Sequence, residues 1–321
     1  MTTLVTPQIR LFEDRDYPAT VAVGNAVYVD YPWSVDAARH EDSRFDGIRL
    51  HLRRYIGEVD GRTVADGEFH HVSNMYHPQK FWVAISVHPE HQGRGIGRAL
   101  YDHLMRELIP YRPLVLWAGV RETFPSSIAF AEHRGFREVR RAWESRLDVS
   151  HFDPAPFRAK AEAGVRGMEI VTVASEQAAD AQWLQKLYDM HNEVAADVPQ
   201  PEPYTPMTLD EFRRRWFDNP EYLPDGHFLA KHGGRYVAES NLFRSIELDR
   251  VLYQGITGTA RAFRGRGIAL ALKLRTIEYA RVHGKHEIRT WNDTLNAPML
   301  AINTQLGFVR QPAWITYERT L

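Results

Sequence analysis

The stretch HPEHQGRGIGRAL, residues 88–100, alternates three glycines with Arg94 and Ile96. The preceding residues 80–87, KFWVAISV, predict a strand, and apolar residues at three- and four-residue spacing over 96–108 predict an amphipathic helix. The first amides of a helix lack intrahelical partners and lie at the positive end of its dipole. Because glycine lets a ligand approach the backbone closely, the stretch predicts an anion nest suited to a phosphate or pyrophosphate.

Nearly the same string, RAFRGRGIALAL, returns at residues 261–272. Gly93-Arg94-Gly95-Ile96 matches Gly265-Arg266-Gly267-Ile268 at a spacing of 172 positions, and Gly135-Phe136 matches Gly307-Phe308 at the same spacing. GRTVAD at 61–66 matches GRYVAE at 234–239 at a spacing of 173. A constant spacing of this size indicates two copies of one domain rather than a solenoid of short repeats. Two tight turns that serve only close packing remain the alternative to two ligand loops.

The repeat predicts a first domain over residues 1–150, a linker over 151–166 and a second domain over 167–321. The linker region contains two prolines and shows no clear period, which is typical of a surface connection.

Strand-like and helix-like segments alternate within each copy. Residues 64–72, 80–87 and 113–120 are rich in β-branched and aromatic residues and predict strands. Helices are predicted over 15–29, 96–108 and 126–133. In the second copy Trp183, Leu184, Leu187, Tyr188 and His191 form one helical stripe, with Ser175 as the predicted N-cap. The predicted fold class is α/β (α+β), with two tandem domains that each have a mixed, mostly antiparallel central sheet flanked by helices.

Composition excludes several functional classes. The chain has 321 residues, a formal net charge of −1 and no cysteine, so disulfides, thiolate metal sites and cysteine nucleophiles are excluded. The near-neutral charge argues against a nucleic-acid partner. No apolar run approaches the length of a membrane span, and the first residues lack the pattern of a signal peptide. We therefore expect a cytoplasmic protein.

Other phosphate-binding loops fit less well. A Walker loop needs Gly-Lys-Ser/Thr, which the sequence lacks. The dinucleotide fingerprint has G-x-G-x-x-G in the first strand-to-helix turn of its domain, whereas this loop reads G-x-G-x-G and follows several other elements.

At these residues the sequence resembles the GNAT superfamily of acyl-CoA-dependent N-acetyltransferases, and in particular its tandem two-domain bacterial members, a group that includes mycothiol synthases. The family signature Q/R-x-x-G-x-G/A is matched by QGRGIG at 92–97 and by RGRGIA at 264–269. A second family motif is matched by NAPMLAINTQLGF at 296–308 and more weakly by FPSSIAFAEHRGF at 124–136.

The resemblance implies acetyl-CoA as co-substrate, and from the residues we expect no metal. It implies that the strand before each loop is bulged and splayed from its neighbour, and that the pantetheine arm pairs with backbone near Ile85 and Val87, or near Thr257 and Thr259. A backbone N–H there would stabilise the developing oxyanion. The implied coenzyme-binding residues are Val87, Gln92, Gly93, Arg94, Gly95, Ile96, Gly97, Thr259, Arg264, Gly265, Arg266, Gly267, Ile268, Ala269 and Asn296.

Two departures from the family pattern bear on chemistry. Phe124 stands where the second copy has Asn296. The tyrosine that protonates the leaving thiolate in many members is replaced by Ala131 and Asn303. The thiolate could leave unprotonated, because a thiol pKa of about 8.5 makes it a tolerable leaving group. Tyr253 is the alternative acid, unless it only packs in the sheet.

A general base would take the proton of the attacking amine. Glu239, on a strand expected to face the cleft, is the candidate in the second copy. Asp66 aligns with it, and Glu68 lies two residues on, on the same strand face. Each could instead be a solvated carboxylate. His70 and His71 are adjacent on a strand and point to opposite faces, so they are not expected to form a metal site.

The segment after the first helix of each copy is expected to wall the acceptor site. In the second copy Glu193, Asp197 and Glu202 make this segment acidic, which favours a cationic amine, unless it is only a solvated proline-rich loop. In the first copy Tyr31 and Trp33 could stack on an acceptor or seal the core.

These features predict an N-acetyltransferase that moves an acetyl group from acetyl-CoA to a primary amine by direct attack. The second copy is expected to be the catalyst because it retains Asn296. The expected partner is a small-molecule amine, with no nucleic acid or membrane, and the protein is expected to be a monomer or homodimer. Two alternatives remain open: a non-catalytic coenzyme-A-binding or scaffold protein, and an acyltransferase that uses a longer acyl donor.

Overall fold

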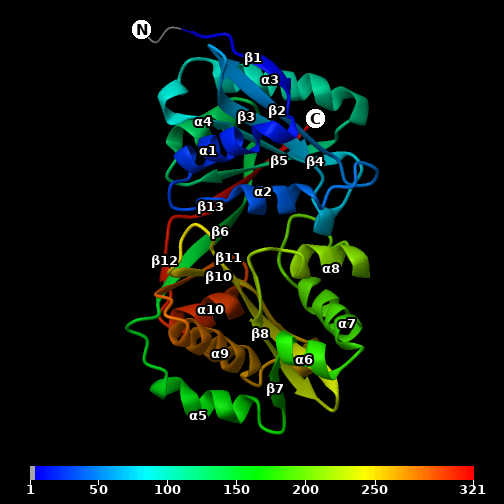
Figure 1. The fold of residues 1–321 in the computed structure, drawn as a ribbon, viewed down its shortest axis with the longest axis vertical. Helices are drawn as coiled ribbons and strands as arrows, with labels where there is room; N and C mark the ends of the chain where they lie inside the picture. Colours follow the sequence, from blue (N-terminus) through cyan, green and yellow to red (C-terminus); the bar gives the residue numbers. More distant parts are fainter. Residues whose placement is uncertain (1–3) are drawn as a thin grey trace. The chain divides into compact units, whose positions relative to one another are not determined.

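The computed structural model describes residues 4–321, so residues 1–3 of the predicted first domain lie outside it. The chain forms two compact units (Figure 1). The first unit comprises the residues up to Val139 together with Ile315–Leu321, and the second comprises Arg140–Trp314. Each unit is a sheet with helices on both faces, which confirms the predicted fold class.

In the first unit the strands run in the spatial order β1-β2-β3-β4-β5-β13. The pairs from β1 to β4 are antiparallel, and β4 is parallel to β5. The elements are β1 (Gln8–Leu11), α1 (Tyr17–Val27), α2 (Val35–Asp42), β2 (Leu52–Val59), β3 (Arg62–His70), β4 (Lys80–Val87), α3 (Ile96–Leu108), β5 (Val115–Arg121), α4 (Pro125–Glu132) and β13 (Trp314–Thr320).

In the second unit the order is β6-β11-β10-β9-β8-β7, and β12 pairs with β6. The elements are β6 (Arg137–Asp148), α5 (Ala155–Gly164), β7 (Glu169–Thr172), α6 (Val173–Ala179), α7 (Trp183–Ala195), α8 (Leu209–Phe217), β8 (Tyr222–His232), β9 (Arg235–Arg244), β10 (Val251–Thr259), α9 (Ile268–Val282), β11 (Glu287–Asp293), α10 (Ala297–Gln305) and β12 (Val309–Arg310).

The last strand of each sequence copy belongs to the sheet of the other unit. Strand β6 is the last strand of the first copy, but its second half pairs with β11, from Asp148 opposite Glu287 to Ala142 opposite Asp293. Strand β13 ends the chain but neighbours β5, and its Tyr317 is buried in the core of the first unit. The division therefore differs from the predicted boundary at residue 150, because the repeat gives the order of the elements and not which copy each strand joins.

Two local expectations also differ from the structure. The predicted linker contains helix α5, whose Gly164 lies against the backbone of Gly267. Ser175 is not the N-cap of the helix that carries the Trp183 stripe. It is the third residue of the short helix α6, where it forms a capping box with Thr172, and α7 begins separately at Trp183.

Helices α3 and α1 pack on opposite faces of the first sheet. On β3, Gly67 lies against Leu100 and Leu104 of α3. The next residue, Glu68, points to the other face, where α1 and α2 lie. The side-chain period of two along a strand therefore separates an apolar α3 face from a polar α1–α2 face.

The central parallel strands separate in both units. Strands β4 and β5 pair only from Lys80 to Trp82, and β10 and β11 pair only from Val251 to Tyr253. Beyond these residues the two strands of each pair are no longer hydrogen-bonded to each other, as the family resemblance implies. The implied bulge is present in β10, between Gln254 and Thr257, whereas β4 pairs with β3 without a register shift.

Candidate coenzyme and acceptor site

The first glycine loop joins the end of β4 to α3 and matches the predicted geometry. Gly93 and Gly95 have φ of 71° and 89°, a left-handed conformation that favours glycine. Gly95 is the N-cap of α3, so no side chain caps the first turn of that helix. The Gln92 side-chain amide donates to the carbonyl of Val87 at 2.9 Å and ties the loop to the strand end. The loop thus presents main-chain donors at a helix N-terminus, as an anion site requires.

A cavity of about 520 Å³ lies next to this loop, between the separated strands β4 and β5. That volume is in the range of small-molecule and cofactor sites. The lining includes strand residues beyond the paired segment, three glycines of the loop and of α3, and side chains of α3, of α4 and of the residues that flank α1 and α4. These residues are Val83, Ile85, Val87, Gly93, Gly95, Gly97, Gly119, Tyr28, Tyr101, Phe124, Phe130 and Ala131. The backbone of β4 is unpaired on its β5 side here, so it can pair with an extended amide-containing arm.

Both departures from the family motif fall on the wall of this cavity. Phe124 packs its ring 5.6 Å from the ring of Tyr28, and Ala131 is buried and offers no acidic proton. Sequence reasoning missed the two phenols on the wall. Tyr101, on α3, receives a hydrogen bond from Arg319, and burial raises the pKa of Tyr28. The one sequence signal for Tyr101 is its position on the apolar, inward face of the predicted helix, which could have indicated that it lines the cavity.

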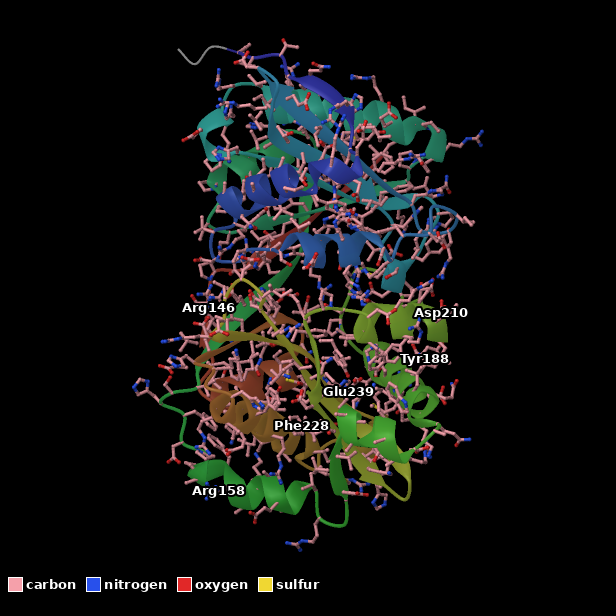
Figure 2. All side chains as sticks on the ribbon, in the orientation of Figure 1. Arg146, Arg158, Tyr188, Asp210, Phe228 and Glu239 are labelled. Atoms are coloured by element: carbon pink, nitrogen blue, oxygen red, sulfur yellow. The ribbon has the colours of Figure 1, made fainter. Side chains whose placement is uncertain are left out.

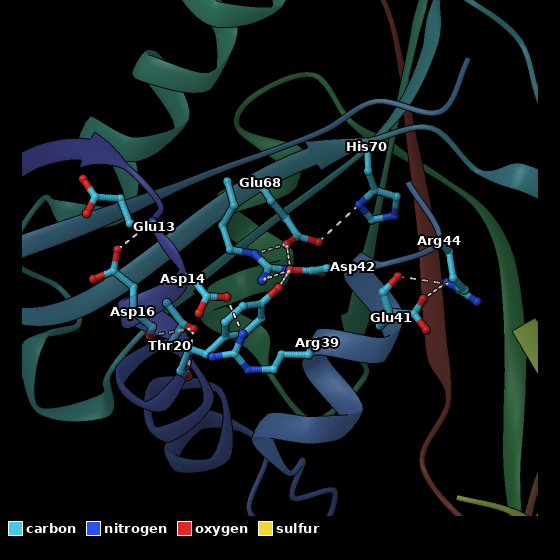
Figure 3. A network of polar contacts seen from close by, with 12 residues as sticks. Glu13, Asp14, Asp16, Thr20, Arg39, Glu41, Asp42, Arg44, Glu68 and His70 are labelled. Carbon is cyan, nitrogen blue, oxygen red and sulfur yellow. Dashed lines mark hydrogen bonds and ion pairs between the residues drawn. The ribbon is translucent and has the colours of Figure 1, made fainter. Parts of the chain in front are cut away.

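Glu68 belongs to a closed polar network on the α1–α2 face of β3 (Figure 3). Arg54 donates from Nε to Glu68 at 2.7 Å and from its other nitrogens to Asp42 at 2.8 and 3.0 Å, and Tyr17 also donates to Asp42 at 2.8 Å. Burial would raise the pKa of Glu68, but the charge of Arg54 and the hydrogen bond from His70 outweigh it and hold this pKa at about 2. Glu68 is therefore a poor proton acceptor.

Asp66 lies two residues before Glu68, on the same face of β3, and is not part of that network. It takes part in no ion pair or side-chain hydrogen bond to another of residues 4–321. Burial, followed by the charge of Glu68, raises the pKa of Asp66 to about 7. It lies opposite Ser86 of β4, one of the residues that line the cavity. A carboxyl group with this pKa beside a cavity can take a proton at neutral pH.

The second glycine loop repeats the geometry of the first. Gly265 and Gly267 have φ of 75° and 90°, and Arg264 Nε donates to the carbonyl of Thr259 at 2.9 Å, as Gln92 does to Val87.

The acidic segment predicted in the second copy lies against this loop. Asp197 accepts hydrogen bonds from Arg261 and Arg264, which lower its pKa to about 2. Glu193 accepts from the backbone N–H of Arg261 at 2.7 Å. Two of the three carboxylates expected to attract an amine are therefore bound to the loop.

Glu239 lies in the interior of the second unit rather than in an open cleft (Figure 2). Its exposed fraction is 0%, and its two oxygens accept from His191 Nδ1 at 2.8 Å and from His227 Nε2 at 3.1 Å. Tyr222 completes the chain by donating to His227 Nδ1 at 2.8 Å. Burial would raise the pKa of Glu239, but the two histidines lower it to about 2. The sequence predicts a strand face directed toward a cleft, whereas α7 covers this face of β9.

The remaining predicted residues of the second unit have structural partners. Tyr253 lies in the part of β10 that still pairs with β11, and its ring lies 5.8 Å from that of Trp291. Asn296 caps α10 by accepting from the backbone N–H of Met299 at 3.4 Å. Asn303, which replaces the family tyrosine, is buried and donates to Asn292 Oδ1 at 2.6 Å.

Within residues 4–321, no group of three or more histidine, aspartate and glutamate side chains is arranged to hold a metal ion. His70 and His71 point to opposite faces, since His70 contacts Glu68 while His71 packs on Phe81. Of the described helices, none is long and apolar enough to cross a membrane.

Comparison with known proteins identifies an acetyltransferase pattern in the first unit. The model of the acetyltransferase (GNAT) family matches residues 20–136, a range that contains the cavity-lining strands, the first glycine loop and α4.

Curated relatives extend the similarity over both units. A mycothiol acetyltransferase of Amycolatopsis mediterranei is 27% identical over 299 residues, covering 89% of this chain and 89% of that protein. A mycothiol acetyltransferase of Catenulispora acidiphila is 24% identical over 297 residues, covering 84% of this chain and 87% of that protein.

Solved structures are similar to this chain over nearly its whole length. A tandem GNAT protein from the clavulanic acid biosynthesis pathway has a TM-score of 0.72 at 21% identity and covers 98% of both chains. A GCN5-related N-acetyltransferase from Sphaerobacter thermophilus has a TM-score of 0.70 at 19% identity, covering 99% of this chain and 97% of that one. At these identities the likeness shows the tandem fold.

Proposed function

Because the chain belongs to the GNAT family of acetyltransferases, we propose that its first unit binds acetyl-CoA between β4 and β5 and passes the acetyl group to the primary amine of a small molecule. The observation that carries this proposal is the cavity of about 520 Å³, which opens where the two strands separate and reaches the glycine loop. In it a diphosphate would meet loop amides while an extended arm follows β4.

The chemistry is direct attack. The amine nitrogen forms a bond to the thioester carbonyl carbon, a β4 backbone N–H near Ile85 stabilises the developing oxyanion, and the C–S bond breaks. We assign Asp66 the role of general base, because its carboxyl group has no competing partner and its pKa is about 7. The thiolate leaves without a proton from residue 131, where Ala131 stands.

The acceptor is proposed to be a small metabolite amine. The full-length relatives are named for an acetyl transfer that involves mycothiol, a small molecule. Tyr28 and Phe124 would form the aromatic side of the entrance to the reacting carbon.

A second candidate is coenzyme binding without catalysis. The observation that favours it is Ala131, which leaves the cavity wall without the usual acid. Turnover distinguishes the two candidates, since a non-catalytic protein would bind acetyl-CoA but release no thiol with any amine of a broad panel.

The test of the coenzyme site uses Gly97→Leu in the full chain. A Cβ at Gly97 would lie 3.6 Å from Val87, so a leucine side chain extends into the cavity without a positive φ. We expect at least a tenfold loss of acetyl-CoA affinity by calorimetry, together with loss of thiol release. Gly24→Leu is the control, because space around that helical glycine is open. Unchanged affinity in Gly97→Leu would overturn the proposed site.

A further inference from the structure

Lys273 of α9 is a buried amine without a counter-ion. Its exposed fraction is 1%, and it forms no ion pair with another of residues 4–321. Its Nζ has one weak hydrogen bond, to Gln254 Oε1 at 3.4 Å, and lies 5.0 Å from the centre of the Phe308 ring. A buried amine with no ion pair and only one weak hydrogen bond is poorly satisfied, so it indicates a missing partner.

The position of Lys273 is the second unit's equivalent of the cavity wall. At the repeat spacing of 172 positions, Lys273 corresponds to Tyr101 and Phe308 corresponds to Phe136. Tyr101 and Phe136 both line the cavity of the first unit. Gln254, whose side-chain oxygen accepts the weak hydrogen bond from Lys273, is the first residue of β10 beyond the segment paired with β11. Lys273 therefore lies where β10 and β11 begin to separate, at the place where the first unit would hold the acyl end of its coenzyme.

A second observation in the same region also indicates a ligand. Asn303 of α10 is 2% exposed, and its Nδ2 donates to Asn292 on β11, beyond the paired segment. Its Oδ1 is buried and has no donor in the described structure. A buried acceptor without a donor is rare in a native protein unless water or a ligand supplies one. The amide N–H groups of a pantetheine arm are donors of the required kind.

We propose that the second unit binds a coenzyme A thioester whose acyl chain ends in a carboxylate, which pairs with Lys273 Nζ. The first unit has at this position Tyr101, which carries no charge of its own and whose hydroxyl group accepts a hydrogen bond from Arg319. The two units would then hold the same carrier with different acyl groups. This inference does not depend on turnover in the first unit.

Burial alone lowers the pKa of Lys273 to about 7, so a carboxylate that enters beside it restores the ammonium form. A buried, hydrogen-bonded ion pair would also select between acyl groups, because a neutral acyl chain of equal length leaves the lysine without a partner.

The experiment compares two four-carbon thioesters, succinyl-CoA and butyryl-CoA, which differ in the terminal carboxylate. Calorimetry uses the full chain with Gly97→Leu, so that the first cavity is filled and the remaining binding reports on the second unit. We expect succinyl-CoA to bind at least about tenfold more tightly than butyryl-CoA. Equal affinities, or no binding of either thioester, would overturn the proposal.

Lys273→Met tests the residue itself in the same background. The preference for succinyl-CoA should disappear while butyryl-CoA still binds, and Lys273→Arg should retain the preference because it keeps the charge. A preference that survives in a folded Lys273→Met protein would also overturn the assignment. If this variant fails to fold, the comparison of the two thioesters in the Gly97→Leu chain decides the matter. Failure of the first-unit proposal appears separately, in the acetyl-CoA titration of Gly97→Leu alone.

Discussion

The two units share a backbone plan and differ in the charged groups they place on it. On the α1–α2 face of the first unit, Arg54 is held between two carboxylates. On the α7 face of the second unit, Glu239 is held between two histidines. His227 stands 173 positions after Arg54, and Glu239 stands 173 positions after Asp66. The same sheet face thus carries a cation between two anions in one unit and an anion between two potential cations in the other.

This difference shows how a duplicated fold diverges. Strand separation and the positive-φ glycines depend on backbone geometry and are present in both units. The buried polar groups depend only on a local balance of charge, which several residue sets can satisfy. Asp66 has no hydrogen-bonded partner among the described side chains, while its counterpart Glu239 is bound by two histidines, and this difference is the basis for proposing proton transfer in the first unit.

The largest expected effect tests that assignment. Asp66→Asn removes the proposed base and should lower turnover by about 10²- to 10⁴-fold while acetyl-CoA affinity is retained. In the unaltered protein the base must be deprotonated, so turnover should rise as the pH increases through about 7. The measurement is thiol release against pH. An Asp66→Asn variant with the turnover and pH profile of the unaltered protein would remove Asp66 from the mechanism.

The next effect tests whether the arginine network supports the first unit. Arg54→Met leaves Asp42 and Glu68 without their cation, and both are largely buried. We expect a loss of about 3–5 kcal/mol in the free energy of unfolding, measured by denaturant titration. Arg213→Met is the matched control, because its ion pairs lie at the surface, and it should cost under about 1 kcal/mol. Equal losses for the two variants would contradict the distinction.

A third prediction concerns the acid stability of the second unit. The folded pKa of Glu239, about 2, lies below its ordinary value of 4.5. The stabilisation is therefore complete above about pH 4.5 and is lost as the pH falls towards 2, with a magnitude on the order of 3 kcal/mol.

Glu239→Gln should flatten this pH dependence, as followed by denaturant unfolding at a series of pH values. Glu68→Gln should do the same in the first unit, because the pKa of Glu68 is also held at about 2. If the Glu239→Gln protein kept the full acid dependence of the unaltered chain, the histidine pairing would not be its source.

The smallest expected effect concerns the second glycine loop. Asp197→Asn weakens the ion pairs to Arg261 and Arg264, which are largely exposed. The free energy of unfolding should fall by about 1 kcal/mol or less, and added salt should reduce the difference further. Thermal melts at low and high salt measure this. A loss of several kcal/mol would show that Asp197 is a structural element of the second unit.

Local features of the fold could be predicted. The turns at Gly93–Gly95 and Gly265–Gly267 need positive φ, and the apolar period of α3 is visible over a few turns. Alternation along a strand is a local property, so the sequence also predicted that Asp66 and Glu68 share one strand face. The engagement of Glu68 by Arg54 and the enclosure of Glu239 were not predictable, since the partners lie on elements far away in the sequence.

The amino-acid sequence by itself determined the duplication, the glycine loops, the order of helices and strands, and the family resemblance. These follow from residue types within a few positions of one another, where backbone torsions and side-chain period decide the outcome. Only the tertiary structure decided which sheet β6 and β13 join, that α7 covers Glu239, and that Lys273 is buried without a counter-ion. Each of these depends on which distant segments pack together, because burial and charge pairing are properties of the assembled chain.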